Sequence, residues 1–277
     1  MDAIFSLRSL FRRHIALPGD HGSWVFLLSP LLIGLFAGGR WTPATLPLIV
    51  ALLAAFLIRQ PITIAAKAYS GRRPRDELPA ARFWMVVYGL VGMLAVVGLV
   101  AQGFDYLLNL AIPAVPVFAW HLHLITRRAE RKQIGVEVVA SGVLALAAPA
   151  AMWVGVGAAD PRGWILWALC WLQSAASIVH AYLRLEQRGL AAVPDLSTRL
   201  NMARRALLYT GFNVIATAAL ALAGFLPPLI FIPFALQFAE TVWGTLRPAV
   251  GARPAAIGVR QLIVSTLFTI LFILIWR

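Results

Sequence analysis

The segment "PATLPLIVALLAAFLIRQPITIAAKAYSGRRPRDELP", residues 43–79, decides the fold class. Its first part is an apolar run of roughly 20 residues, the length that a helix needs to cross the hydrocarbon core of a bilayer. Arg59 interrupts the end of that run, and a tract dense in arginine follows it. An apolar stretch that ends in basic residues is typical of a transmembrane helix whose end lies in the cytoplasm.

The rest of the chain has the same character as this segment. Of its 277 residues 61% are hydrophobic and only 13% are charged, and the mean hydropathy is +0.81. These values exceed what a soluble domain of this size reaches, so the composition predicts an all-α polytopic membrane protein. The single cysteine, Cys170, lies within an apolar segment, which excludes a disulfide framework within the chain.

Hydropathy divides the chain into about nine segments long enough to span a membrane, within a single integral-membrane domain over residues 1–277. The expected spans are 24–39, 43–66, 83–101, 104–120, 136–156, 162–182, 206–223, 225–243 and 257–276.

The basic residues are distributed unequally over the connections of this nine-span arrangement. All 24 Lys and Arg residues except Arg40, Arg162 and Arg277 fall on the side of the N-terminus. The positive-inside rule then predicts a cytoplasmic N-terminus and an outside C-terminus, in the inner (plasma) membrane. The expected cytoplasmic segments are an N-terminal arm, 1–23, and the polar stretches at about 67–82, 121–135, 183–205 and 244–256.

This topology, together with attraction to anionic lipid headgroups, explains the formal net charge of +13. No stretch resembles a nucleic-acid-binding module, so we expect no nucleic-acid partner. The sequence indicates no particular protein partner.

Two rows of polar side chains have the same helical spacing and begin inside predicted spans. Arg59, Thr63 and Lys67 stand at i, i+4 and i+8 and therefore share one helix face. The second row, with the same spacing, is His180, Arg184 and Arg188. An arginine as deep as Arg59 is costly in lipid, so it should face the bundle interior, and the two rows predict one basic pocket that opens to the cytoplasm. Alternatively, Lys67, Arg188 and their neighbours extend to the interface as ordinary helix-end cations.

Nine spans with polar segments after spans two and six resemble the UbiA superfamily of intramembrane prenyltransferases. That resemblance implies Asp-rich DxxxD motifs in the two segments, where aspartates hold the magnesium ions that bind an isoprenyl diphosphate. This chain contains no DxxxD, and the acids of its first segment, Asp76 and Glu77, are adjacent and diverge on a helix. Magnesium at a diphosphate needs several converging oxygens, so we expect no metal, no cofactor and no conventional magnesium-dependent prenyl transfer.

At a finer level, "DHGSW" at 20–24 and "LLSPLLIGL" at 27–35, followed by "RQP" at 59–61, resemble the YwiC-like family of membrane proteins. The order of these short elements strengthens the resemblance, which extends over essentially the whole chain.

Replacement of acids by cations favours a pocket that binds an anionic ligand without a metal. Arginine can hold a phosphate or a carboxylate bidentately, so the predicted ligand is a membrane lipid or an isoprenoid-type anionic amphiphile, with Arg59, Thr63, Lys67, Arg184 and Arg188 as its anion-binding residues. A metal-independent group transfer could follow. The alternative is a transporter or a non-catalytic accessory membrane subunit, because intramembrane ionisable residues also suit transport.

For such a transfer, His21 and His180 are the candidate acid and base. Asp20 would support His21 by fixing its tautomer or raising its pKa. Glu240 is an acid within a predicted span and should pair inside the bundle, with Arg247 or with a pocket arginine.

Overall fold

The computed structural model describes residues 10–19, 21–127 and 133–276, and over these residues the chain is helical, with no strand. Asp20 lies outside the described residues, as does the side chain of His21. The helices are α2 (Arg13–Ala16), α3 (His21–Ala37), α4 (Thr45–Tyr69), η1 (Arg75–Glu77), α5 (Leu78–Ala101), η2 (Asp105–Leu110), α6 (Ala111–Thr126), α7 (Ile134–Ala145), α8 (Ala147–Val156), α9 (Arg162–Gln187), α10 (Leu196–Leu222), α11 (Phe231–Leu246) and α12 (Pro254–Trp276).

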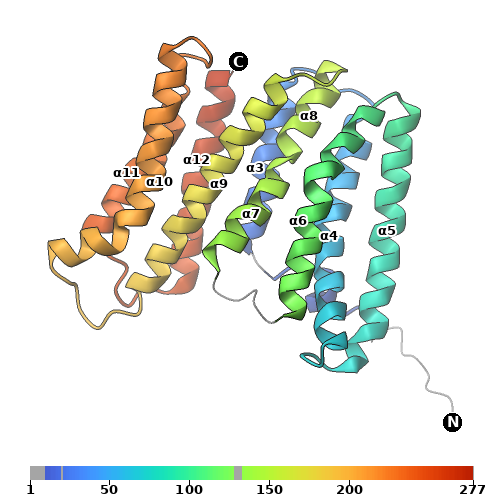
Figure 1. Ribbon diagram of the computed structural model, residues 1–277, viewed down its shortest axis with the longest axis horizontal. Coiled ribbons are helices and arrows are strands. Elements are labelled where there is room, and N and C mark those ends of the chain that lie inside the picture. The colour runs from blue at the N-terminus through green and yellow to red at the C-terminus, as the bar shows by residue number, and fades with distance from the viewer. Residues whose placement is uncertain (1–9, 20, 128–132, 277) are drawn as a thin grey trace.

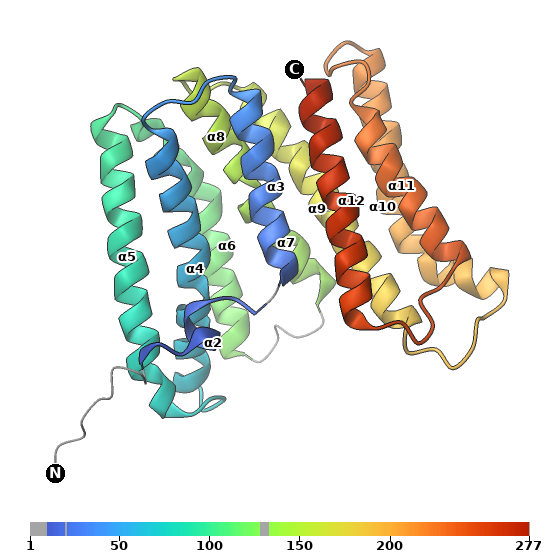
Figure 2. The ribbon, with the colours of Figure 1, turned by 180° about the vertical axis from the view of Figure 1, so that it is seen from behind.

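The long helices stand side by side in an elongated bundle, and consecutive ones run in alternating directions (Figures 1 and 2). Helix α5 forms one edge, α10 and α11 form the other, and α3, α7, α8, α9 and α12 lie between them. We call the end with the connections 70–74, 188–195 and 247–253 the arm end, because α2 lies there. The opposite end, with the connections 38–44, 157–161 and 223–230, is the far end.

Seven of the helical segments are long and apolar enough to cross a membrane. The chain is therefore a multi-pass membrane protein of all-α class, as the composition predicts. Two predicted spans fall short of this length: α3 is an apolar helix of 17 residues and α11 has 16. The count of nine spans thus stays a prediction, although α3 and α11 run alongside the longer helices (Figures 1 and 2).

One predicted span, 136–156, is interrupted in the structure. Helix α7 ends at Ala145 and α8 begins at Ala147. Pro149 explains the break, because a proline has no N–H and its ring clashes with the carbonyl of the residue four positions earlier, which is Ala145. The hydropathy of this stretch remains that of one crossing, which is why the apolar pattern alone does not reveal the break.

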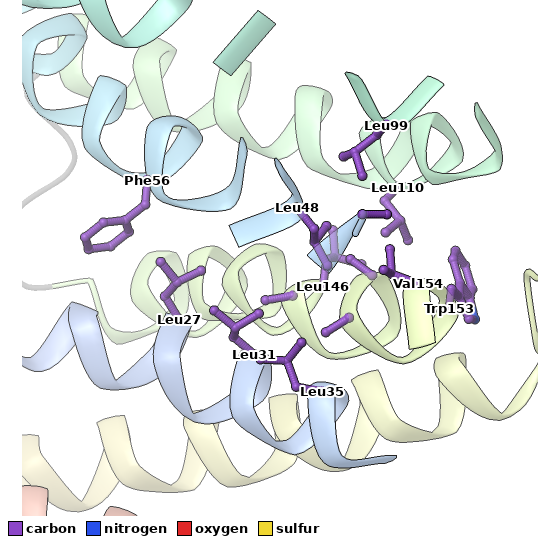
Figure 3. Close-up of a cluster of buried hydrophobic side chains, with 14 residues drawn as sticks. Leu27, Leu31, Leu35, Leu48, Phe56, Leu99, Leu110, Leu146, Trp153 and Val154 are labelled. Atoms are coloured by element: carbon purple, nitrogen blue, oxygen red, sulfur yellow. The ribbon is translucent and has the colours of Figure 1, made fainter. Parts of the chain in front are cut away.

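Close helix contact at glycines holds the middle of the bundle together. A Cβ on Gly34 of α3 would stand 2.2 Å from the carbonyl oxygen of Ala148 in α8, so only glycine permits this approach. Leucines of α3 pack beside it into a cluster of buried side chains that also takes in Phe56, Leu110 and Leu146 (Figure 3).

The N-terminal arm packs against α4 and α5 at the arm end. Ile15 of α2 is fully buried against Ile64 and Ala80. His14 Nε2 lies 3.2 Å from Oε1 of Glu77, and Arg73 donates to Oε2 of the same carboxylate at 2.8 Å. The arm therefore fixes the basic tract after α4 to the body of the protein.

Candidate functional site

Two cavities between the described helices contain residues that the sequence singles out. The first, here called the α4–α6 cavity, has a volume of about 430 Å³ and is walled by α3, α4, α6, α7 and α8. The second, the α9–α12 cavity, has about 580 Å³ and is walled by α9, α11 and α12.

The α4–α6 cavity is built on one face of α4. Leu52, Ala55, Phe56 and Arg59 follow one another at i, i+3, i+4 and i+7, so they line up along the same side of the helix. From α6 opposite, Ala114, Phe118 and His121 line the cavity in the same way. Leu27, Leu110 and Leu146, three side chains of the buried cluster in Figure 3, close it on the remaining sides.

Arg59 supplies the positive charge of this cavity. Among the described residues that line it, Arg59 is the one Lys or Arg, and the rest are apolar except His121. Its guanidinium carbon lies 5.0 Å from the centre of the Phe56 ring, within the range of a cation–π contact. The site is thus an apolar chamber with one half-buried cation in its wall.

The other members of the first predicted row lie nearer the arm end. Thr63 and Lys67 continue the face of Arg59 towards the end of α4, and both are half-buried. Neither lines the α4–α6 cavity or the α9–α12 cavity.

The second predicted row reaches the α9–α12 cavity with two of its three residues. His180 and Arg184 line this cavity and are buried, with 6% and 7% of their surface exposed. Arg188 is exposed just after α9 and donates from Nε to the carbonyl of Ala252 at 3.3 Å.

Arg184 is held by the end of α11. Its Nη1 donates to the carbonyl oxygens of Gly244 at 2.7 Å and Arg247 at 2.8 Å, and to Oε1 of Gln187 at 2.9 Å. The last carbonyls of a helix have no partner within the helix, so this guanidinium satisfies the C-terminus of α11. Arg184 therefore has a structural role that explains its burial.

Glu240 pairs with Arg260, which is neither Arg247 nor one of the predicted pocket arginines. Arg260 of α12 holds its carboxylate with both Nε, at 2.5 Å, and Nη2, at 2.8 Å. The guanidinium carbon of Arg260 also lies 3.5 Å from the centre of the Trp243 ring. His180 Nε2 faces the same carboxylate at 3.9 Å. Arg247 instead contributes its backbone carbonyl, to Arg184.

The structure therefore places the two predicted rows apart. The α4–α6 cavity and the α9–α12 cavity share no lining residue, so Arg59 and Arg184 do not converge on one pocket. His180, a candidate acid or base, belongs to the cavity without Arg59.

Sequence reasoning missed Arg260, Gln237 and Trp243. Arg260 falls inside the expected span 257–276, near its start at the arm end. A carboxylate and a guanidinium that both lie near the arm end of neighbouring spans are expected to form an ion pair. This signal could have identified the Glu240–Arg260 pair.

Over the residues that the structure describes, no three His, Cys, Asp or Glu side chains gather as they would around a metal ion.

A family model described as "YwiC-like protein" matches residues 17–152 of the chain. Among curated proteins, the "Uncharacterized protein YwiC" of Bacillus subtilis (strain 168) is 28% identical over 165 residues, which cover 57% of this chain and 61% of the relative. The match thus spans less than two thirds of that relative's length. No solved structure matches the chain, and the likeness to UbiA proteins stays a prediction.

Proposed function

We propose that the α4–α6 cavity, which lies wholly within the residues 17–152 that match the YwiC-like family model, is the ligand site of the protein. Its ligand is an anionic amphiphile, such as an isoprenoid or a lipid with a phosphate or carboxylate headgroup. The single observation that carries the proposal is an apolar chamber with Arg59 in its wall.

The apolar tail fits the greater part of the chamber. Apart from Arg59 and His121 its lining is aliphatic or aromatic, and its volume of about 430 Å³ is within the usual range of ligand cavities. Alanines at 55, 114 and 140 leave the space that larger side chains would fill.

The anionic head fits Arg59. This residue lies ten positions before the end of α4, roughly 15 Å from the arm end at 1.5 Å per residue. A cation at such a depth is expensive in a bilayer, and intramembrane ionisable residues generally mark functional sites. A guanidinium can bind two oxygens of a phosphate or carboxylate at once, which offsets that cost.

We further propose that the arm end faces the cytoplasm and that the protein crosses the inner (plasma) membrane nine times. Two considerations support this: most of the described basic residues lie in the connections at the arm end or in the parts of the helices nearer to it, and the described Arg40 and Arg162 lie at the far end. Arg59 would then be reached by headgroups of the cytoplasmic leaflet.

Native mass spectrometry of the protein purified in mild detergent tests the proposed function. We expect the wild type to retain a defined anionic amphiphile, and we expect Arg59→Gln and the cavity-filling Ala114→Phe to retain at least tenfold less. Arg40→Gln is the matched control, because it removes an exposed arginine at the far end.

Equal, unselective lipid in all four proteins would overturn the proposal and would favour the alternative of a transporter. Thermal unfolding of each variant verifies that the comparison is made between equally folded proteins.

A further inference from the structure

The α9–α12 cavity lies wholly outside the family-matched residues, and it has a different chemistry from the α4–α6 cavity. Five of its lining side chains are polar and deeply buried: Ser177, His180, Arg184, Gln237 and Ser265. Buried polar atoms in membrane proteins normally have hydrogen-bond partners, so those without one indicate where a ligand group can bind.

The side chain of Gln237 contains an acceptor atom that receives no hydrogen bond. Its Nε2 donates to the carbonyl oxygen of Gln173 at 3.0 Å and to Oγ of Ser177 at 2.9 Å. A carbonyl oxygen can only accept, so the orientation of the Gln237 amide is fixed and Oε1 must be the other atom. This oxygen is buried and has no hydrogen-bond partner, in a residue that is only 4% exposed.

His180 presents a second such atom. Its Nε2 faces the Glu240 carboxylate at 3.9 Å, which favours the tautomer with the proton on Nε2. Nδ1 is then an acceptor, and it too is buried without a hydrogen-bond partner.

The cations of this cavity are already engaged by protein groups. Arg260 is held bidentately by Glu240, and Arg184 donates to the carbonyl oxygens at the end of α11. The groups that lack partners are therefore acceptors, and an anionic headgroup would bring more acceptors to them. The cavity calls for a ligand that donates hydrogen bonds and adds no negative charge.

The cavity is open on the side of α12. Val259 and Ile263, which line it, are 57% and 55% exposed, and the alanines at 255 and 256 leave space beside them. Exposed aliphatic side chains on a membrane-spanning helix face lipid, so a ligand with an apolar chain can enter from the bilayer.

We infer that the α9–α12 cavity is a second binding site, for an uncharged amphiphile whose headgroup carries a hydroxyl. The hydroxyl donates to Oε1 of Gln237 or Nδ1 of His180, and the chain lies along Val259 and Ile263. This inference does not depend on the proposed function, because the two cavities share no residue.

The test is photolabelling of the full chain in phosphatidylcholine nanodiscs, whose lipid headgroups contain no hydroxyl. The probe is a dodecanol that carries a diazirine in its chain, and peptide mass spectrometry locates the label. We expect labelling of α12 at the cavity, and dodecanol should compete about tenfold better than dodecyl methyl ether, a difference of about 1.4 kcal/mol. The ether has the same chain but no donor.

Two variants and two controls complete the test. Gln237→Met keeps the size of the side chain but loses the acceptor, so the preference for the alcohol should fall to near one. Ala256→Phe fills the cavity from an exposed position and should abolish labelling even if Gln237→Met fails to fold. Leu267→Phe, on α12 but lining neither cavity, should label as the wild type does, and so should Arg59→Gln.

Equal competition by the alcohol and the ether would overturn the inference. Labelling that survives Ala256→Phe would overturn it as well, since the probe would then bind elsewhere. Loss of the amphiphile from Arg59→Gln with unchanged alcohol labelling would show that the two cavities bind their ligands independently.

Discussion

The two cavities of this protein differ in how their charges are used. In the α9–α12 cavity, Glu240 and Arg260 pair with each other, and Arg184 holds the end of α11. In the α4–α6 cavity, Arg59 is the one Lys or Arg of the described lining, which is apolar apart from His121. A concentration of ionisable residues in a membrane protein can therefore reflect helix packing as readily as ligand binding.

The largest expected effect on stability comes from helix packing at two glycines rather than from charges. Gly34→Ala should destabilise the protein by about 3 kcal/mol or prevent folding, because the new Cβ would collide with the backbone of Ala148. Gly244→Ala in α11 should lower the free energy of unfolding by only about 1 kcal/mol. Its Cβ would meet His180 Cε1 at 3.0 Å and Arg184 Nη1 at 3.2 Å, and side chains can adjust.

Thermal unfolding in detergent measures both glycine variants. If Gly244→Ala is less stable than Gly34→Ala, His180 and Arg184 cannot adjust to the added methyl group as expected.

The next effect separates the two arginines. Arg184→Gln should lower the free energy of unfolding by about 2 kcal/mol, because it leaves buried carbonyl oxygens of α11 without a charged donor. Arg59→Gln should cost less stability, since Arg59 is half-buried whereas Arg184 is buried, yet it should lose the bound amphiphile. Unfolding curves measure the stability of both proteins, and native mass spectrometry measures the amphiphile that each retains. Loss of the amphiphile from Arg184→Gln at unchanged stability would reverse the two assignments.

The smallest expected effect concerns the pair at the mouth of the α9–α12 cavity. The side chain of Arg260 is 43% exposed, so solvent weakens its attraction to Glu240. A double-mutant cycle with Glu240→Gln and Arg260→Gln should give a coupling free energy of about 1 kcal/mol. A coupling near zero would mean that the two side chains act independently and that Glu240 serves His180 instead.

Much of the fold is readable from the sequence because hydropathy reports directly on the bilayer. The apolar runs predict where helices lie, and the described chain is helical as expected. The break between α7 and α8 is missed because Pro149 lies inside an uninterrupted apolar run, and hydropathy carries no signal for backbone geometry.

The site is harder to predict because helical spacing identifies a face but not the helices that it meets. Arg59 and His180 each line a cavity, whereas Thr63, Lys67 and Arg188, which continue the same two rows, line neither cavity. The spacing does not say that α4 faces α6 while α9 faces α11 and α12, so two separate cavities look like one basic pocket. Arg260 is missed for the same reason, because its partner Glu240 lies 20 residues earlier in the chain and on another helix.

The most direct test of the central claim is a cryo-electron microscopy structure of the protein bound to a prenyl monophosphate. We expect density for the prenyl chain between α4 and α6, with phosphate oxygens about 3 Å from the guanidinium nitrogens of Arg59. A ligand found in the α9–α12 cavity, with its phosphate on Arg184, would show that the α4–α6 cavity is not the site of the anionic amphiphile.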